Sequence, residues 1–206
     1  MNGRFITFEG PEGSGKTSVM KAVAATLAAD GHDITTTREP GGIKIAEQIR
    51  KVLLDVDNTE MDARTEALLF AASRRQHMVE KVLPALQAGR IVLCDRFVDS
   101  SLAYQGVGRD LGIDEVYAIN RFAIHDRLPD LTIFIDVPPS IGLKRVFDNG
   151  RDIDRLDVES ARFHEKVYRG YQEVIATYPS RIKRVDGTAS LEQVTQAALT
   201  LIQAIL

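Results

Sequence analysis

Cysteine is nearly absent from this chain of 206 residues, and long apolar runs are missing altogether. The single cysteine, Cys94, excludes an internal disulfide framework, so we expect a reducing, cytoplasmic setting. No stretch of about 18 apolar residues is present to cross a membrane, and no charged-then-apolar leader opens the chain. The net charge of -3 at pH 7 argues against a nucleic-acid groove, because such surfaces are basic. Neither a membrane nor a nucleic acid is therefore an expected partner.

Short apolar runs alternate with longer helical patterns. The runs predict five strands, at Arg4–Glu9, Ile34–Arg38, Ile91–Asp95, Leu131–Asp136 and Ile182–Asp186. The helical patterns cover Lys16–Ala29, Ala63–Leu86 with a break near Pro84, Glu159–Tyr178 and Leu191–Leu206. Strands separated by helices form βαβ units, so we expect an α/β fold with a parallel five-stranded sheet and helices on both faces. The length predicts a single domain, 1–206.

The segment after the first predicted strand matches the phosphate-binding pattern G-x-x-x-x-G-K-[ST]. It consists of Gly10, Pro11, Glu12, Gly13, Ser14, Gly15, Lys16 and Thr17. The glycines let successive backbone N–H groups face phosphate oxygens, and the following helix adds its dipole. Lys16 is expected to reach the β- and γ-phosphates and the Thr17 hydroxyl to bind Mg²⁺. The strand before and the helix after this loop favour a nucleoside triphosphate site over a chance glycine-rich turn.

Several further features narrow the function of this loop. The strings D-x-x-G and N-K-x-D, which a GTPase would carry, do not occur, and the four histidines lack metal-ligand spacing. Arg38 and Arg96 each stand at the carboxyl end of a predicted strand, where parallel sheets bind ligands. Two arginines there suggest a second anion opposite the loop. A structural ion pair between Arg96 and Asp95 is the alternative.

Six strings follow one another along most of the chain: Phe5–Gly10, the phosphate loop with Glu12, Thr37–Gly42, Leu69–Arg74, Asp95–Arg96 with Ser100–Gly106, and Pro129–Thr132. Together they resemble bacterial thymidylate kinases, although the phosphate loop itself is widespread. The resemblance implies a P-loop fold of the nucleoside monophosphate kinase type. It also implies the reaction ATP + dTMP → ADP + dTDP in dTTP biosynthesis, with Mg²⁺, in a homodimer.

The resemblance assigns roles around the acceptor base. Phe70 would stack on thymine, Arg74 would donate to its O4, and Gln105 would meet its N3–H edge, since an amide can both donate and accept. Ser101 would lie near the same edge. Tyr104 would pack against the sugar C2′ and disfavour a ribose hydroxyl. Packing in the hydrophobic core is the alternative for Phe70 and for Tyr104.

Other roles concern the phosphates. By the same resemblance, Arg38 and Arg96 would grip the dTMP phosphate, assisted by Arg50. Glu12 would accept a hydrogen bond from the sugar 3′-hydroxyl. Besides Thr17, the metal-binding side chains would be Asp95 and Glu39.

The polar stretch Asn149–Asp157 is expected to be a mobile lid loop. Thymidylate kinases carry a catalytic arginine either in the phosphate loop or in the lid. Positions 11–14 hold no arginine, whereas the lid has Arg151 and Arg155. We therefore expect one of these, Arg155 in preference to Arg151, to reach the transferring phosphoryl group. An ordinary solvated charged loop is the alternative.

Two other functions stay open at the level of the sequence. One is a kinase for another pyrimidine monophosphate, because the 5-methyl group of thymine is worth only about 1–3 kcal/mol in a pocket. The other is a P-loop module that binds nucleotide without turnover.

Overall fold

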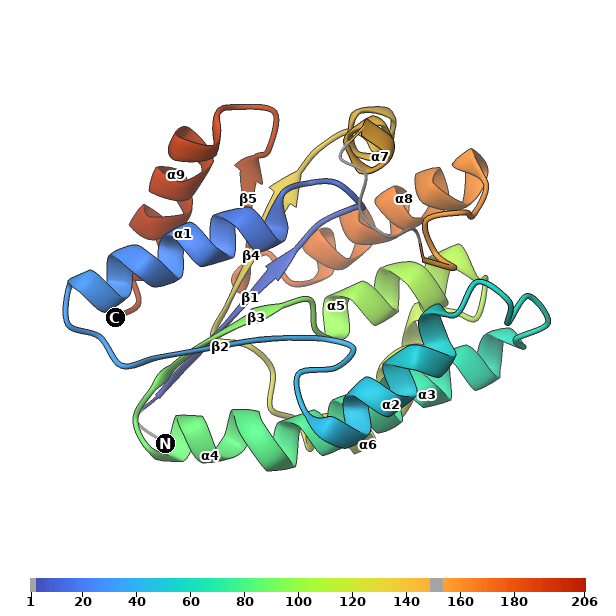
Figure 1. Cartoon of the computed structure of the whole chain (residues 1–206), viewed down its shortest axis with the longest axis horizontal. Helices are drawn as coiled ribbons and strands as arrows, with labels where there is room; N and C mark the ends of the chain where they lie inside the picture. Colours follow the sequence, from blue (N-terminus) through green and yellow to red (C-terminus); the bar gives the residue numbers. More distant parts are fainter. Residues whose placement is uncertain (1–2, 149–153) are drawn as a thin grey trace.

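A computed structural model describes residues 3–148 and 154–206. Its centre is a five-stranded, fully parallel sheet in the order β2-β3-β1-β4-β5 (Figure 1). The strands are β1 Arg4–Glu9, β2 Ile34–Arg38, β3 Ile91–Asp95, β4 Leu131–Asp136 and β5 Ile182–Asp186. The predicted α/β fold and all five predicted strands are confirmed.

Helical segments connect these strands, and one more follows the last strand. They are α1 Lys16–Ala29, α2 Lys44–Leu54, α3 Ala63–His77, η1 Met78–Val82, α4 Leu83–Gln87, α5 Val98–Ser101, η2 Leu102–Gly108, α6 Ile113–Ile124, α7 Pro139–Asp148, α8 Ala161–Thr177 and α9 Leu191–Gln203. The predicted helix Ala63–Leu86 is divided, because the π-helical turn η1 separates α3 from α4. Pro84 stands just after this turn and cannot donate a backbone hydrogen bond.

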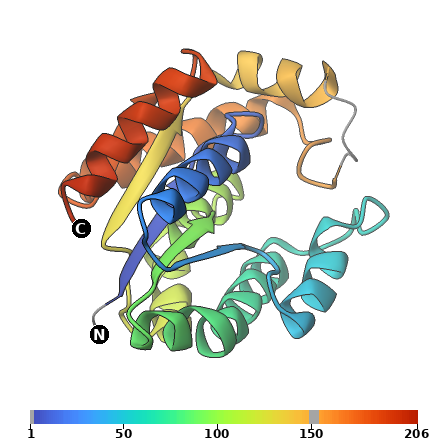
Figure 2. The same cartoon turned by 60° about the vertical axis from the view of Figure 1, so that its left-hand side comes forward.

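Both faces of the sheet are covered by helices (Figures 1 and 2). On one face, Ile6 and Phe8 of β1 pack with apolar residues of α1 and α9. On the other face, Phe5 and Cys94 pack with residues of α3, η2 and α8. Cys94 is fully buried, and burial raises the pKa of its thiol well above the usual value, as befits a packing residue. No helix in the described ranges is long and apolar enough to span a membrane.

The phosphate loop is held between β1 and α7. Gly13 has φ 67°, in the left-handed region that glycine adopts without steric cost. A Cβ at Gly13 would lie 2.0 Å from the carbonyl oxygen of Gly142 in α7, so only glycine permits this approach. The helix that leads to the lid therefore rests directly on the loop.

Gly170 of α8 tests how tightly the helical layer is packed. A Cβ there would lie 2.9 Å from the Val107 Cβ and 3.0 Å from the Ala103 carbonyl oxygen. Gly170→Ala should therefore lower the free energy of unfolding by about 1–3 kcal/mol through overpacking, measured by urea denaturation. Helix propensity alone predicts a gain instead. Glu173→Ala, on the exposed side of the same helix, is the control and should change stability by less than about 0.5 kcal/mol. A stabilised Gly170→Ala protein would contradict this account.

Candidate active site

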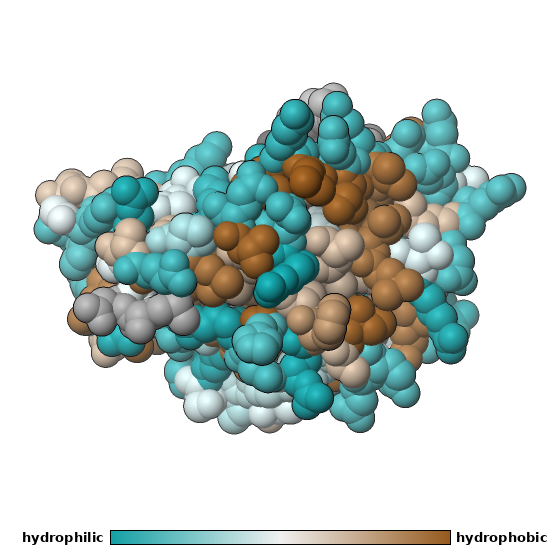
Figure 3. Space-filling view, turned by 90° about the horizontal axis from the view of Figure 1, so that it is seen from below, coloured by the Kyte–Doolittle hydropathy of each residue, from teal (hydrophilic) through white to brown (hydrophobic). Residues whose placement is uncertain are grey.

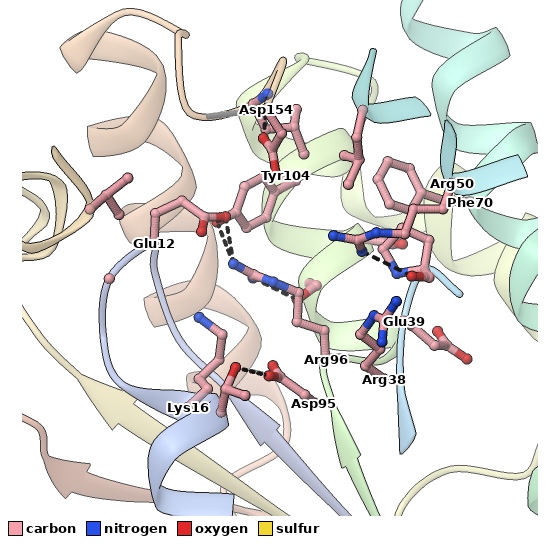
Figure 4. Close-up of a pocket in the computed structure, with 18 of the residues that line it drawn as sticks. Glu12, Lys16, Arg38, Glu39, Arg50, Phe70, Asp95, Arg96, Tyr104 and Asp154 are labelled. Carbon is pink, nitrogen blue, oxygen red and sulfur yellow. Dashed lines mark hydrogen bonds and ion pairs between the residues drawn. The ribbon is translucent and has the colours of Figure 1, made fainter. Parts of the chain in front are cut away.

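A cavity of about 400 Å³ opens where the carboxyl ends of β1, β2 and β3 meet the helices (Figure 4). The phosphate loop forms one side of its lining, and α2, α3 and η2 contribute to the other. Fifteen of the predicted site residues line it: Glu12, Gly13, Gly15, Lys16, Thr17, Arg38, Glu39, Arg50, Phe70, Arg74, Asp95, Arg96, Ser101, Tyr104 and Gln105. The structure thus brings the two predicted halves of the site together.

Lys16 is buried inside the phosphate loop. Its Nζ donates to the carbonyl oxygens of Gly10 at 2.9 Å and Pro11 at 2.8 Å, and to Ser14 Oγ at 3.3 Å. Burial, reinforced by the charge of Arg96, lowers the pKa of Lys16 to about 8. An anion bound in the loop would therefore stabilise the ammonium form.

Two of the three predicted metal-binding side chains lie together. The Thr17 hydroxyl donates to a carboxylate oxygen of Asp95. Glu39 is placed differently, because its carboxylate accepts from Arg74 Nε at 2.7 Å and pairs with His77 Nδ1 at 2.8 Å. Burial opposes ionisation of Glu39, but Arg74 and His77 outweigh it and lower the pKa of the carboxyl group. Glu39 is thus placed as a partner of Arg74 and His77, and its contact with Mg²⁺ stays a prediction.

Arg96 occupies the centre of the cavity (Figure 4). Its backbone has φ 68°, an unusual conformation for a side-chain-bearing residue. The guanidinium donates to Glu12 Oε1 at 2.5 Å, to the Tyr104 hydroxyl at 3.3 Å, and to Ser100 Oγ and the Tyr171 hydroxyl at 3.2 Å each. Burial disfavours its charge, but Glu12 and its other neighbours outweigh this and raise the pKa of Arg96. Arg96 is therefore a permanent cation next to the phosphate loop.

The buried carboxylate of Glu9 accepts hydrogen bonds from residues that surround Arg96. Glu9 accepts from the Phe97 backbone N–H at 2.7 Å, from Ser100 Oγ at 2.5 Å and from the Tyr171 hydroxyl at 2.9 Å. Burial and the charge of Asp99 raise the pKa of Glu9 to about 7. Sequence reasoning gave Glu9 no role, although a charged residue closing an apolar strand was a signal.

Two further arginines line the side of the cavity facing Arg96 (Figure 4). Arg38 is half-exposed and pairs with Glu47 Oε1 at 2.7 Å. Arg50 donates to the Pro40 carbonyl at 3.0 Å. Burial and the charge of Arg38 lower the pKa of Arg50. Three guanidinium groups thus surround one part of the cavity, which is suited to an anion.

Beside Arg50, on the side of the cavity away from Lys16, the lining combines the Phe70 ring with buried polar side chains, as we expect of a base pocket (Figure 4). Phe70 and Arg74 lie one helical turn apart on α3 and are both buried. Arg74 donates to Glu39, to Ser101 Oγ at 3.0 Å, to Asn120 and to the Phe97 carbonyl at 3.0 Å. Four of the five guanidinium N–H groups are used in this way, so one remains to donate to a ligand.

Gln105 lines the same cavity, and its amide nitrogen donates to Glu66 Oε1 at 2.7 Å. Glu66 also accepts from Arg109 and Arg155. Sequence reasoning missed Glu66, although its position one helical turn before Phe70 places it on the same face of α3. It is therefore part of the surroundings of the base pocket.

Of the two arginines predicted to act from the lid, Arg155 lies within the described residues, and its recorded hydrogen bonds go elsewhere than the phosphate loop. Arg151 lies outside the described residues. Arg155 is buried against α2 and α3, where it donates to the Leu53 carbonyl at 2.9 Å and to Glu66 Oε2 at 2.6 Å. The expectation that Arg155, in preference to Arg151, reaches the phosphoryl group is not supported by this placement. Its guanidinium instead attaches the described end of the predicted lid, residues 154–157, to α2 and α3.

Comparisons with known proteins agree with this geometry. The family model described as thymidylate kinase matches residues 8–198. The thymidylate kinase of Oceanobacillus iheyensis is 58% identical over 207 residues, covering 100% of this chain and 92% of that protein. The thymidylate kinase of Bacillus velezensis is 58% identical over 203 residues, covering 98% and 96%. The crystal structure of thymidylate kinase from Ehrlichia chaffeensis superposes with a TM-score of 0.79 at 30% identity, covering 98% of this chain and 99% of that one.

Sequence similarity extends over nearly the whole chain and includes both halves of the cavity. The TM-score of 0.79 over nearly the full length of both chains shows that the two proteins share their overall fold. The chain therefore belongs to the thymidylate kinase family of ATP-dependent nucleoside monophosphate kinases.

Proposed function

We propose that this cavity transfers the γ-phosphoryl group of ATP to dTMP, with each substrate held by the residues that line its own side. The observation that carries the proposal is the placement of Lys16, Arg38, Arg50 and Arg96 around one cavity that is also lined by an aromatic ring, Phe70, and an amide, Gln105. The comparisons favour this reaction over another pyrimidine kinase or a non-catalytic module. The phosphate loop binds ATP through its backbone N–H groups and Lys16, as such loops do.

The thymine ring lies against Phe70 in this proposal, with its polar edge toward Arg74, Ser101 and Gln105. The remaining N–H of Arg74 donates to O4, since its other donors are fixed by the protein. The carbonyl oxygen of Gln105 accepts from N3–H, because its amide nitrogen is engaged by Glu66. Cytosine has an amino group at C4 and a bare N3, so it meets the wrong partner at both positions.

Binding of dTMP replaces an ion pair that the protein forms within its own site. Glu12 and Arg96 form an ion pair at 2.5 Å, and the Tyr104 hydroxyl donates to Glu12 at 2.9 Å. On binding, the dTMP phosphate takes the guanidinium of Arg96, assisted by Arg38 and Arg50. Glu12 then accepts from the 3′-hydroxyl, and the Tyr104 ring leaves no room for a 2′-hydroxyl. The charge of Arg96 is thus compensated before and after the exchange, whereas Glu12 passes from an ion pair to a hydrogen bond with a neutral hydroxyl.

Mg²⁺ fits the pair formed by Thr17 and Asp95. Mg²⁺ is usually held by one or two carboxylates together with substrate phosphates rather than by a protein cage. In line with this, the described residues contain no group of three or more His, Cys, Asp or Glu side chains arranged to bind a metal. When bound, the ion neutralises charge on the β- and γ-phosphates.

Transfer needs no general base, because the acceptor oxygen of dTMP is already anionic. The residues contribute by aligning the two phosphates and balancing charge as it moves, which is the main source of catalysis in phosphoryl transfer. Lys16 and Arg96 do this within the described residues. We assign the lid contribution to Arg151, because Arg155 is held by Glu66 and Leu53. An arginine in such a position contributes about 10³–10⁵ in rate.

The proposal also includes the organisation and setting of the protein. Residues 1–206 form a single domain, and the enzyme acts in the cytoplasm.

A panel of acceptors tests the base and sugar contacts. With Mg²⁺ and ATP, ADP release should be strong with dTMP, weaker with dUMP, and negligible with dCMP, UMP, AMP and GMP. The loss with dUMP should be about 10- to 200-fold, as expected for one methyl group in a pocket. Turnover led by UMP or dCMP would contradict the assigned roles of Gln105 and Tyr104. Binding of ATP without any acceptor-dependent turnover would contradict catalysis itself.

The buried ammonium of Lys16 predicts a pH dependence. With a pKa of about 8, Lys16 is charged at pH 7 and loses its charge as the pH rises through 8. Because kcat/KM reports the free enzyme, kcat/KM for ATP should fall about tenfold per pH unit above pH 8. In Lys16→Arg, the guanidinium does not titrate between pH 7 and 9.5, so kcat/KM for ATP should no longer fall with pH. Its value should be lower than that of the natural protein at pH 7. Circular dichroism checks folding at each pH. A profile of the natural protein that stays level to pH 9.5 would refute the assignment.

We propose a homodimer that forms through the face made by α2, α3, η1 and α6. This face carries exposed apolar side chains, namely Ile45, Val52, Leu68, Val79 and Phe122. In Figure 3, which views the molecule from below Figure 1, hydrophobic side chains gather over these helices. Large contiguous apolar patches are uncommon on monomers and mark interaction surfaces.

Replacing an apolar side chain by a charge tests this interface. Sedimentation should give twice the chain mass of 22.8 kDa for the natural protein. Phe122→Glu should shift the equilibrium to the monomer, because Phe122 is 89% exposed in the single chain and a buried unpaired charge is costly. Phe147→Glu, at a 55% exposed position on α7, is the matched control and should leave the dimer intact. A dimer that survives Phe122→Glu, or a natural protein that sediments as a monomer, would contradict the proposal.

A further inference from the structure

Glu66 is a buried carboxylate that no step of the reaction uses. It lies on α3 with no exposed surface. Oε1 accepts from Gln105 Nε2 at 2.7 Å, and Oε2 accepts from Arg109 Nη2 at 3.0 Å and Arg155 Nη2 at 2.6 Å. Arg109 also reaches Oε1 through Nε at 3.3 Å. One carboxylate therefore joins the base pocket to the lid end at 154–157.

The charge state of Glu66 decides which way the Gln105 amide is turned. Burial opposes ionisation, but the hydrogen bonds and charge of Arg109, with help from Gln105 and Arg155, outweigh it and lower the pKa of Glu66. An ionised carboxylate can only accept hydrogen bonds. Gln105 must therefore present its NH₂ group to Glu66, which turns its carbonyl oxygen the other way. Within residues 3–148 and 154–206, no hydrogen bond engages that oxygen.

We infer that Glu66 is a specificity-determining positioning residue, which selects bases with an N3–H group by locking the orientation of the Gln105 amide. Thymine donates from N3 and is accepted by the fixed carbonyl oxygen. Cytosine carries a lone pair at N3, so oxygen faces nitrogen with no proton between them. If the amide turned over, its NH₂ group would donate to cytosine N3 and repel thymine. An amide that is free to turn over does not discriminate between the two bases at N3, so the discrimination at this position comes from Glu66.

The arginines make the effect of a single substitution predictable. In Glu66→Gln, the side-chain oxygen remains with Arg109 and Arg155, because both arginines can only donate. The new amide nitrogen must then face Gln105, which turns over to accept from it. The Gln105 NH₂ group would then point to the base. At N3, this contact would favour the bare nitrogen of cytosine over the N3–H group of thymine.

The first test measures kcat/KM for dTMP and dCMP in Glu66→Gln. The ratio of dCMP to dTMP should rise about 10- to 100-fold, the factor that corresponds to leaving a buried donor or acceptor without its hydrogen bond. The swap Glu66→Gln with Gln105→Glu should restore the low ratio. In this double variant, the amide introduced at position 66 donates to one oxygen of the carboxylate introduced at position 105, whose other oxygen accepts from N3–H. A simple loss of packing would not be rescued by this exchange.

Glu159→Gln is the matched control for stability. It removes the Glu159 charge that pairs with Arg109 at 2.6 Å but leaves Glu66 with Gln105, Arg109 and Arg155, so it should lower the melting temperature and change the base ratio by less than about twofold. Should Glu66→Gln not fold, Glu66→Asp keeps the charge but retracts it by one methylene group, and the ratio should again rise. An unchanged ratio in a folded Glu66 variant would overturn the inference.

The inference rests on the proposed contact between Gln105 and the base, and Gln105→Leu separates the two. If Gln105→Leu raises the ratio of dCMP to dTMP and the Glu66 variants do not, the Gln105 contact stands and the role of Glu66 is refuted. If Gln105→Leu leaves the ratio unchanged, the base contact itself is refuted, and the role of Glu66 falls with it.

Discussion

Charge balance inside one cavity is the constraint on which this site depends. Lys16, Arg38, Arg50 and Arg96 line a volume of about 400 Å³, and like charges so close together need compensation. The compensation comes from carboxylates that belong to the protein, with Glu12 paired to Arg96 and Glu47 to Arg38. Substrate phosphates can replace these carboxylates as partners of the arginines, so that the buried cations stay compensated when substrate binds. The site therefore stays folded while it is poised to bind polyanions.

Arg96 shows how the fold enforces this arrangement. It follows β3 directly, and its backbone takes a left-handed conformation that costs about 1–3 kcal/mol. The cost is offset by five polar partners, among them Glu12 and Tyr104. Glu9 then fixes the partners Ser100 and Tyr171 from below. The central cation is thus positioned by two layers of hydrogen bonds that start from the ends of β1 and β3.

Buried carboxylates have a different role at the base pocket. Glu39 is paired with Arg74 and His77, Glu66 is paired with Arg109 and Arg155, and each carboxylate orients a side chain that lines the cavity. Arg74 is held by Glu39, and Gln105 is held by Glu66. Fixed donors and acceptors of this kind give a pocket its selectivity, because a mismatched ligand leaves buried polar groups unpaired. The same residues would be misplaced if their carboxylate partners were neutral.

The sequence predicted the strands and the phosphate loop because both follow from local patterns. Apolar runs bounded by polar residues specify buried parallel strands, and the loop has a fixed spacing. Helices α2, α5, α6 and α7 were not predicted, because short or interrupted patterns gain their stability from tertiary packing. The same limit applies to the π-helical segments η1 and η2.

Side-chain partners across the fold were the least predictable feature. Nothing local shows that Glu39 meets His77, that Arg155 turns to Glu66, or that Glu9 meets Tyr171. These contacts join residues between 38 and 162 positions apart. Helical spacing was informative only within one element, as for Glu66, Phe70 and Arg74 on α3.

The exchange of partners at Arg96 is the central claim, and a crystal structure with dTMP and a non-hydrolysable ATP analogue tests it most directly. We expect the Arg96 guanidinium to lie within hydrogen-bond distance of the dTMP phosphate, with Glu12 at the 3′-hydroxyl and the 2.5 Å contact between Arg96 and Glu12 opened. A complex in which that ion pair persists while the dTMP phosphate binds elsewhere would contradict the account.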